Sequence, residues 1–427
     1  MKFRINVAKL MQLVKPAVDI ALKNIKKSDI NELFYCAGML TIEASTDDLC
    51  VKAYGGTASI IVRVDKTDGY IPDVNGIVTV RASEVMECLK SFQPTDKLIV
   101  STDDEQLTIS LESDPEIFVG LPTLPNNIEC PIIPKKSVKK CLVDRAYFVK
   151  GLQKIAYAVA VEEKMFTYMC ILFESWKNKM RFSAGTGGRF ACLTIDGDSH
   201  KISDKEASIL LPKTNISNVI RTFKDSNQPS IRVRTIEQNS SRRIPEQVVL
   251  ESGNITLALY GSESFTKYPD LTAFIDHNYS YSISTRMSDW KSAIEAIKAS
   301  RRSHKSNIHN TDVIADLIQG NFLIRPRTEM KISRKVGFEF GAYEANYSKD
   351  KNHKPWFRTN SNHLIEMVQK GYKDGTMIVN FDDQAKLAEI PEGEPKQMKP
   401  VVITYPTKTN KDGTREKYSV FFTVSTK

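Results

Sequence analysis

The sequence predicts an α+β fold built from three tandem modules, each with antiparallel sheets and two helices. A short apolar strand that leads into an amphipathic helix occurs three times, near Leu10, Phe148 and Trp290. A second helix, flanked by β-rich segments, follows each of these openings after a similar interval. The length of 427 residues agrees, because a domain has about 150 residues on average. One architecture repeated three times therefore accounts for the chain.

Each module begins with a strand that leads into a helix. The apolar residues of these helices recur at helical spacing, so one face packs and the other is exposed to water. Pro16 lies inside the first helix and lacks an N–H group, so we expect it to kink or divide that helix. Asp144 is a suitable N-cap residue for the second helix. The strand and helix pairs are expected at residues 1–5 and 7–22, 140–143 and 144–160, and 281–284 and 288–300.

The second helix of each module follows the same pattern, and we expect these helices at residues 83–92, 214–224 and 361–372. The segments between helices alternate between apolar and polar residues or run apolar between turns, which predicts antiparallel strands. Pro-rich and polar stretches mark the ends of the first two modules. The predicted domains are residues 1–136, 137–278 and 279–427.

The charge of the chain is biased toward Lys and Arg on the exposed helix faces. The chain has 60 Lys and Arg against 51 Asp and Glu, a net charge of +9. One basic helix face is most often an ordinary solvated surface, but equivalent faces on six helices favour a track for a phosphate backbone that ignores base sequence. The candidate DNA contacts are Lys9, Lys23, Lys27, Lys90, Arg145, Lys150, Lys154, Arg221, Lys224, Lys291 and Lys370.

Tandem modules whose sheets join edge to edge can close into a ring, because closure removes exposed strand edges. The sequence shows no apolar run long enough for a membrane helix and no secretory signal, so we expect a cytoplasmic protein without a membrane partner. Seven scattered cysteines predict reduced core residues rather than disulfides.

Two rival interpretations stay open at this point. The first is a metal-dependent nucleic-acid-processing enzyme with repeated β-rich domains, for which Asp47 and Asp48, Asp103 and Asp104, or Asp382 and Asp383 would hold the metal. The same Asp pairs are typical of turns, and no phosphate loop, zinc motif or nucleophile elbow accompanies them. The second rival is a monomeric adaptor that binds peptides but does not close around DNA.

Several separate stretches of the chain resemble one known family. Residues 180–191 read Met-Arg-Phe-Ser-Ala-Gly-Thr-Gly-Gly-Arg-Phe-Ala, and residues 207–213 read Ala-Ser-Ile-Leu-Leu-Pro-Lys. Both stretches resemble the middle domain of the bacterial sliding clamp, the beta subunit of DNA polymerase III. The segments at residues 121–125 and 265–270 are similar to the same family and fall in the same order.

The resemblance implies a head-to-tail homodimer of six domains that encircles double-stranded DNA as a processivity factor in DNA replication. It implies no catalysis and no cofactor. The ring would slide on DNA in the cytoplasm, associated with the nucleoid, or in the host cytoplasm if a virus encodes it. The DNA polymerase, the clamp loader and other clamp-binding peptides would insert into a hydrophobic pocket between the second and third domains.

The resemblance also assigns residues by position. Gly185 and Gly188 stand where the family usually has larger side chains, and the C-terminal tail departs from the usual ending, which implies a peptide preference particular to this chain. The dimer interface would use Val119 and Ile297. The partner-peptide pocket would use Tyr168, Gly187, Arg189, Phe190, Pro269 and Phe274, with Val420, Phe422 and Val424 on its other wall.

Overall fold

The computed structural model contains two compact units, each of which is described by itself. The first unit comprises Met1–Lys150 and Ser203–Phe265, and the second comprises Gly151–Ile202 and Thr266–Lys427. The predicted domain boundaries stay predictions, since the two units divide the middle module between them. The structure describes residues 1–21, 37–103, 105–124, 139–160, 166–186, 188–197, 201–236, 247–260, 268, 277, 279–302, 310–327, 333–345, 354–370, 375–383 and 401–422.

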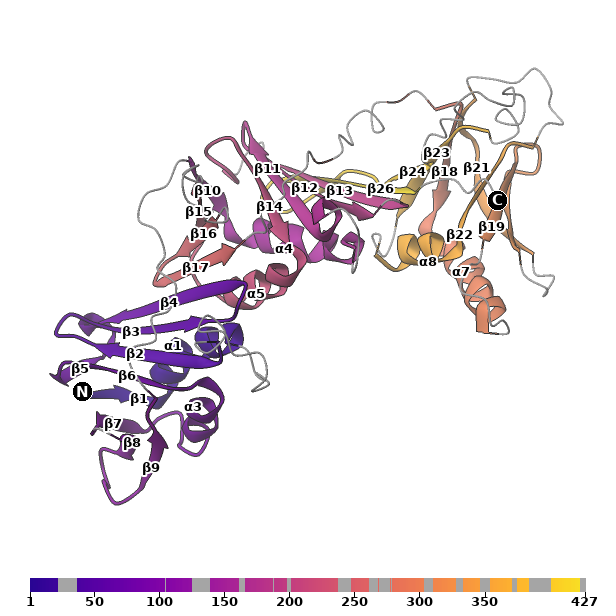
Figure 1. Cartoon of the computed structure of the whole chain (residues 1–427). Helices are drawn as coiled ribbons and strands as arrows, with labels where there is room; N and C mark the ends of the chain where they lie inside the picture. Colours follow the sequence, from indigo (N-terminus) through magenta and orange to yellow (C-terminus); the bar gives the residue numbers. More distant parts are fainter. Residues whose placement is uncertain are drawn as a thin grey trace. The chain divides into compact units, whose positions relative to one another are not determined.

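The three predicted openings of strand and helix are present (Figure 1). A polar side chain sets the start of the first two helices: the Asn6 carboxamide oxygen accepts the N–H of Ala8 at 2.9 Å, and the Asp144 carboxylate accepts the N–H of Tyr147 at 3.0 Å. The N-cap role predicted for Asp144 is therefore confirmed. The pairs are β1 (Lys2–Asn6) with α1 (Val7–Ile20), β10 (Lys139–Asp144) with α4 (Arg145–Ile155), and β18 (Tyr281–Arg286) with α7 (Met287–Arg302).

Helix α1 runs through Pro16 to Ile20 as one element, so Pro16 does not divide it, and the alternative, a kink, stays a prediction. A proline in a helix interior costs about 3 kcal/mol. Leu13 and Val14 precede Pro16 and are buried. Burial of each of these two side chains contributes roughly 1.5–3 kcal/mol, which is sufficient to offset the lost hydrogen bond.

The second helix of each module also follows directly from a strand. Its buried face repeats at helical spacing, as in α5, where Ile216, Val219 and Phe223 are buried. The pairs are β6 (Gly76–Arg81) with α3 (Ala82–Leu89), β14 (Ala207–Pro212) with α5 (Lys213–Phe223), and β22 (Trp356–Asn360) with α8 (Ser361–Lys370). The predicted repeat of six helices is therefore present in the structure.

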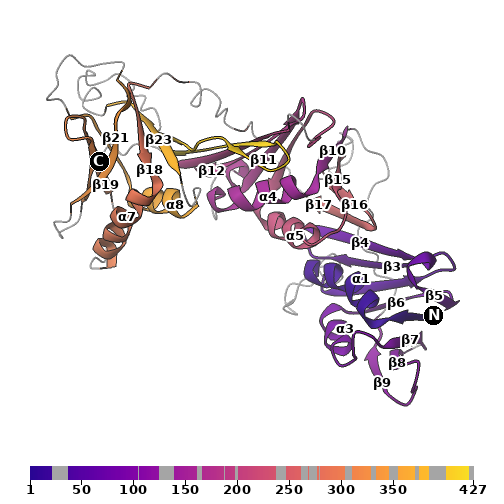
Figure 2. The ribbon, with the colours of Figure 1, turned by 180° about the vertical axis from the view of Figure 1, so that it is seen from behind.

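The first unit contains two antiparallel sheets. One has the order β5 (Ile71–Val74), β1, β7 (Lys97–Thr102), β8 (Gln106–Leu111) and β9 (Phe118–Pro122). Helix α1 packs on β3 and β4 of the other sheet and contacts both α3 and α5, so these helices lie next to one another (Figures 1 and 2). That sheet has the order β10, β15 (Ser230–Ile236), β16 (Gln247–Ser252), β17 (Ile255–Tyr260), β4 (Ala58–Asp65), β3 (Asp48–Tyr54), β2 (Met39–Ala44) and β6.

One strand pair in this sheet joins the first predicted module to the second. Strands β4 and β17 run antiparallel from the pair Ala58 and Leu259 to the pair Val62 and Ile255. We call this pairing the first joint. Apart from backbone bonds, the Ser59 and Tyr260 hydroxyls lie 2.8 Å apart across it.

The second unit contains the corresponding connection between the second and third modules. Strand β13 (Arg189–Asp196) pairs antiparallel with β26 (Arg415–Phe422) over eight residue pairs. We call this pairing the second joint. The sheet order is β11 (Cys170–Trp176), β12 (Lys179–Thr186), β13, β26, β24 (Val401–Thr404), β23 (Thr376–Phe381), β18, β21 (Arg334–Ala345), β20 (Asn321–Pro326), β19 (Asn310–Asp316) and β22, with β25 (Lys408–Thr409) beside β26.

The outer strands of the first unit differ in how their edges are protected. Strand β10 ends its sheet, and the Asp204 carboxylate accepts the N–H of Leu142 at 2.6 Å, so part of this edge is already bonded. Strand β9 ends the other sheet beside two exposed apolar side chains, Ile117 at 51% and Phe118 at 57% of their surface. The β9 edge is therefore apolar, as is the β5 edge at the other end of that sheet, where Ile71 is 50% and Val74 54% exposed.

Candidate functional site

The second joint places a charged residue of β13 against a helix of the third module. Arg189 forms an ion pair with Glu366 of α8 through Nη1, and its Nη2 donates to the Tyr157 carbonyl oxygen at 3.0 Å. Tyr157 follows α4 in a short 3-10 helix, η3 (Ala156–Ala158). Burial lowers the pKa of the Arg189 guanidinium, whose side chain is 19% exposed. The arginine thus connects three elements.

The aromatic part of the site lies next to this arginine on the same strand. The Phe190 ring meets the Tyr168 ring edge-on, with centroids 5.9 Å apart. It also packs against a buried cluster that includes Tyr279 and Phe421. Phe190 itself is only partly buried, which is typical of a side chain that can accept an apolar group of a ligand.

Gly185 explains how a ring of this size fits. Gly185 pairs with Phe190 across β12 and β13. A Cβ atom at Gly185 would lie 2.1 Å from the Phe190 ring and 2.6 Å from the Arg189 carbonyl oxygen, distances that a folded protein does not tolerate. The small residue at this position, seen in the sequence as a departure from the family, makes room for the ring.

Strand β26 supplies the other wall of the candidate pocket. Val420 is buried opposite Ala191, and Phe422 pairs with Arg189. The Tyr418 hydroxyl lies 2.6 Å from that of Tyr157, and burial raises the pKa of Tyr157 to about 12. Tyr168, Phe190 and the buried Phe421 lie on one face of the sheet, whereas Arg189 and Val420 occupy the alternate positions that point to its other face. Their assigned roles in a peptide pocket stay predictions.

Two pocket neighbours on α8 were not predicted from the sequence. Besides Glu366, His363 lies near Arg189, and burial together with the positive charge of Arg189 lowers its pKa to about 4. His363 is therefore neutral at pH 7. His363 and Glu366 lie one helical turn apart on α8, a helix whose polar face is predicted from the sequence to be basic. An acidic residue among those cations was the available signal.

The exposed basic residues of the first unit cluster on its helices. Lys9 on α1, Lys90 after α3, and Arg221 and Lys224 at the end of α5 are exposed. Because α1 contacts both α3 and α5, these cations belong to adjacent helices. In the second unit Lys291 is exposed on α7. Exposed cations on adjacent helices are suited to contact successive phosphates of a nucleic-acid backbone rather than one small anion.

Three residues of α4 differ from this pattern. Arg145 donates to the carbonyl oxygens of Phe223 at 3.0 Å and Lys224 at 2.8 Å, so its guanidinium caps the end of α5. Lys150 lies over the Tyr147 ring, and the Lys154 ammonium lies 4.6 Å from the centroid of the Tyr418 ring. These side chains are half-buried against protein groups, and their role as DNA contacts stays a prediction.

Comparison with known proteins gives a consistent result for the fold. No family model and no curated protein matches the sequence. Solved structures match over the full length: the beta subunit of DNA polymerase from Streptococcus pyogenes has a TM-score of 0.75 at 12% identity, with 100% of both chains covered. The DNA polymerase III beta subunit of Caulobacter crescentus has a TM-score of 0.72 at 16% identity, again with 100% of both chains covered.

The chain has the sliding-clamp fold. A third match, the DNA polymerase sliding clamp of Pseudomonas aeruginosa with a ligand, has a TM-score of 0.74 at 13% identity and covers 100% of this chain and 99% of the other. The α+β fold class predicted from the sequence, with three clamp-type modules, is confirmed.

The two residues predicted for the dimer interface differ in exposure. Val119 is half-buried on the edge strand β9, beside the exposed Phe118, because successive residues of a strand point to opposite faces. Ile297 is buried on α7. Both assignments stay predictions.

Some predicted residues lie outside the part of the chain that the structure describes. They are Lys23, Lys27, Gly187, Pro269, Phe274 and Val424. Lys370 and Phe422 belong to described elements, but their side chains are not described. Their assigned roles stay predictions.

One described carboxylate of each acidic pair considered for a metal site bonds to another protein group. Asp48 and Ser45 close a turn, the Asp103 carboxylate accepts the N–H of Gln106 at 2.8 Å, and Asp382 accepts the N–H of Ser280 at 2.9 Å. In the described ranges, no three His, Cys, Asp or Glu side chains are grouped as a metal ion would require. The described helices also include none that could cross a membrane.

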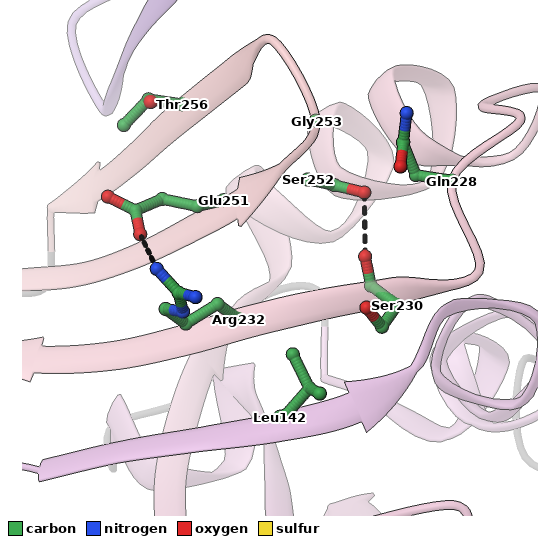
Figure 3. Close-up of a pocket in the computed structure, with 8 residues that line it drawn as sticks. All are labelled: Leu142, Gln228, Ser230, Arg232, Glu251, Ser252, Gly253 and Thr256. Carbon is green, nitrogen blue, oxygen red and sulfur yellow. Dashed lines mark hydrogen bonds and ion pairs between the residues drawn. The ribbon is translucent and has the colours of Figure 1, made fainter.

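The first unit also has a separate cavity with a volume of about 360 Å³. Figure 3 shows the residues that line it. Within it Arg232 faces Glu251 at 3.9 Å, and the Ser252 hydroxyl donates to the Ser230 carbonyl oxygen at 2.8 Å. Its charges are paired with one another, and it contains none of the residues predicted from the sequence. The lining residues are Leu142, Gln228, Ser230, Arg232, Glu251, Ser252, Gly253 and Thr256.

Proposed function

We propose that this chain is a DNA sliding clamp, a non-catalytic processivity factor that closes around double-stranded DNA as a homodimer and tethers a replicative polymerase. The observation that carries the proposal is the full-length match to sliding clamps, which covers every module of the chain. The clamp would act on DNA in the cytoplasm. Its other partners would be a clamp loader and further proteins that carry clamp-binding peptides.

The exposed cations on α1, α3 and α5 support the DNA part of the proposal. Lys9, Lys90, Arg221 and Lys224 belong to adjacent helices of one unit. Lys and Arg attract phosphates without reading bases and release counterions, so such contacts weaken steeply with salt. A closed ring that relies on them stays on DNA by topology and remains free to slide.

The edge strand β9 supports the homodimer. An antiparallel edge with exposed apolar side chains is a template for pairing with a second chain. Ile117 and Phe118 are each more than half exposed there. We propose that this edge meets the third module of a second copy in a head-to-tail contact, and that two such contacts close the ring.

The second joint supports the tethering function. Tyr168 and Phe190 offer aromatic surface, Phe421 lies opposite Phe190 on the facing strand, and Arg189 precedes Phe190 on β13 with a charge. An apolar centre with a polar border is the usual composition of a peptide-binding hot spot. Pro269 and Phe274 complete this pocket in the proposal.

The decisive experiment compares retention on circular and linear DNA. Purified protein should run as a dimer of twice 48.2 kDa and show a central hole by negative-stain microscopy. Once loaded on nicked circular duplex, it should remain bound in high salt and leave when a nuclease linearises the circle. A monomer, a particle without a hole, or equal loss from circular and linear DNA would refute the clamp.

Charge-reversed variants separate DNA contact from folding. Arg221→Glu with Lys224→Glu should weaken retention and reduce the dependence of binding on salt, by a log–log slope of roughly 1.8 if both residues contact phosphates. The matched control is Arg63→Glu with Arg232→Glu, an equal charge change at exposed strand positions. Equal losses in both variants would indicate that net charge, and not the helix row, holds the DNA.

The rival enzyme is tested in parallel. Hydrolysis of DNA that requires a divalent metal and disappears with Asp382→Asn or Asp48→Asn would overturn the non-catalytic assignment. The Asp48 carboxylate accepts from the Ser45 hydroxyl within a turn, and the Asp382 carboxylate accepts from Ser280 of a distant segment, so we expect no hydrolysis with or without metal. The monomeric adaptor would be indicated by a stable single-copy mass together with peptide binding.

A further inference from the structure

The sheet of the second unit carries charged side chains on the face opposite to α4. Helix α4 packs on the Phe182 side of this sheet, where a Cβ atom at Gly151 would lie 2.2 Å from the Phe182 ring. Successive residues of a strand point to opposite faces. Arg181 therefore points away from α4, together with the residues in register with it on the next strands, Thr194 and Lys417.

Positive charge gathers at the end of this sheet where two hairpins turn. Lys177 is exposed in the turn from β11 to β12 and has a positive φ of 42°. The strand register sets this turn beside the start of β26, because Lys179 pairs with Asp196 and Asp196 pairs with Arg415. We call this surface the basic end. Its cations are Lys177, Lys179, Arg181, Lys411, Arg415 and Lys417.

Three of these cations have carboxylate partners. Two nitrogens of the Arg181 guanidinium lie 2.8 and 2.7 Å from one Glu174 carboxylate oxygen. The Asp196 carboxylate is shared, at 2.7 Å from the Lys179 ammonium and 3.8 Å from the Arg415 guanidinium. One carboxylate thus serves two cations, so these pairs do not neutralise the surface.

The other three cations are available to a ligand. Lys177, Lys411 and Lys417 are exposed, and none of them forms an ion pair with a described carboxylate. Asp412 lies in the same turn as Lys411, but its carboxylate accepts the Thr414 hydroxyl at 2.6 Å and the Thr414 N–H at 3.0 Å. The basic end therefore has an excess of positive charge, which attracts a polyanion.

An aromatic ring at the basic end favours a nucleic acid over an acidic protein segment. Trp176 pairs with Lys179 across β11 and β12, so it shares their face of the sheet. Its indole is half-buried, and the Arg181 guanidinium carbon lies 5.0 Å from the ring centroid. Unpaired bases stack on aromatic rings and on guanidinium planes while cations hold the phosphates. An acidic protein segment would match the charge alone.

We propose that the basic end binds single-stranded nucleic acid without regard to its sequence. Lys177, Lys411 and Lys417 contact phosphates, and a base stacks on Trp176. This site lies on the face of the sheet opposite to α4 and is separate from the cations on α1, α3 and α5. It lies within one unit, so the proposal does not depend on ring closure.

The probe is a fluorescent oligo-dT of twenty nucleotides, titrated into the full-length protein and followed by anisotropy. The triple variant Lys177→Gln, Lys411→Gln and Lys417→Gln should weaken binding by at least about tenfold in low salt and flatten the log–log salt slope by roughly 2. Trp176→Ala should weaken binding about fivefold or more, whereas Trp176→Phe should keep most of the affinity.

Two controls separate this site from net charge and from acidic proteins. The matched variant Lys2→Gln, Lys66→Gln and Lys97→Gln removes equal charge at exposed positions of the first unit and should stay within about twofold of wild type, because such distant charges are screened. A labelled twenty-residue polyglutamate should bind more weakly than oligo-dT, and Trp176→Ala should leave its affinity unchanged.

The outcomes decide between the occupants. Loss of oligo-dT affinity in the Lys triple variant and in Trp176→Ala, with retention in Trp176→Phe, supports the single-strand site. Polyglutamate bound as tightly as oligo-dT, with both indifferent to Trp176→Ala, would assign the surface to an acidic protein segment and overturn the proposal. Equal losses in the two Lys triple variants, or no binding of oligo-dT to wild type, would also overturn it.

Discussion

The two joints have the same backbone plan and different side chains. Both are antiparallel strand pairs that continue a sheet from one module into the next, through β4 and β17 in the first unit and through β13 and β26 in the second. The first joint adds a pair of hydroxyls, Ser59 and Tyr260. The second adds an ion pair, a partly exposed ring and a glycine that admits it. Strand pairing alone is thus sufficient to connect modules. The additional side-chain interactions of the second joint need another explanation, and the proposed peptide binding would provide one.

The largest predicted effect distinguishes the two joints, since a change at the second joint should lower peptide affinity and a change at the first should lower only stability. Phe190→Ala should cost about 2 kcal/mol or more in affinity for a clamp-binding peptide, because a partly buried aromatic ring in a pocket is a typical hot spot. Leu257→Ala at the first joint removes a fully buried side chain and should cost roughly 2–5 kcal/mol of stability, with no change in affinity. Calorimetric titration and urea unfolding measure the two quantities. Loss of affinity in Leu257→Ala would erase the distinction.

The next effect concerns the space under the Phe190 ring. Gly185→Ala should lower the free energy of unfolding by about 1–3 kcal/mol, since its Cβ would overlap the ring and the Arg189 carbonyl oxygen. Combining it with Phe190→Ala should cost less than the sum of the single changes. Gly337→Ala is the control, because its nearest neighbour lies 3.9 Å away. Additive costs by urea unfolding would show that ring and glycine are independent.

A smaller effect follows from the buried histidine of the second joint. The pKa of His363 is lowered from its usual 6.5 to about 4, so below pH 6.5 the unfolded chain binds a proton that the folded chain does not. Its contribution is fully present above pH 6.5 and is lost as the pH falls toward about 4, at less than about 1.4 kcal/mol per pH unit. His363→Phe should show a shallower decline of the urea midpoint in this window. Parallel curves for the two proteins would contradict the shift.

The smallest effect belongs to the first joint. Ser59→Ala and Tyr260→Phe each remove one partner of a hydroxyl pair 2.8 Å apart, and each should cost roughly 0.5–1.5 kcal/mol of stability. The double variant should cost less than the sum of the two single costs, because the second change removes a hydroxyl whose partner across the joint is already gone. Peptide affinity should stay at the wild-type value in all three. A change in affinity would assign the first joint a binding role.

The order of elements could be predicted from the sequence because local signals determine it. Cap residues such as Asn6 and Asp144, followed by helical periodicity, mark where helices begin. The local signal of Pro16 does not divide α1, because burial of Leu13 and Val14 offsets the missing hydrogen bond. Periodicity also cannot say which strands pair over long distances, so the contact of β26 with β13 depended on the family resemblance.

Only part of the candidate site could be predicted, because only some of its residues lie in the stretches that resemble the family. Arg189 and Phe190 lie in the stretch that carries the resemblance, so they were found. Glu366 lies 177 residues from its partner and has no motif, and only the folded chain brings the two together. At β9, the strand pattern does not tell which of Phe118 and Val119 points outward, because both are apolar and a shift of one residue exchanges the faces.

The difference between the β9 and β10 edges of the first unit also determines how subunits could assemble incorrectly. A head-to-tail contact that does not close continues as an open filament. The Asp204 carboxylate occupies part of the β10 edge, whereas β9 is the last strand of its sheet in the described part of the chain and lies beside the exposed Ile117 and Phe118. Mispolymerisation should therefore propagate through β9, and a charged residue in place of Phe118 should keep subunits apart during expression and storage while leaving each one folded.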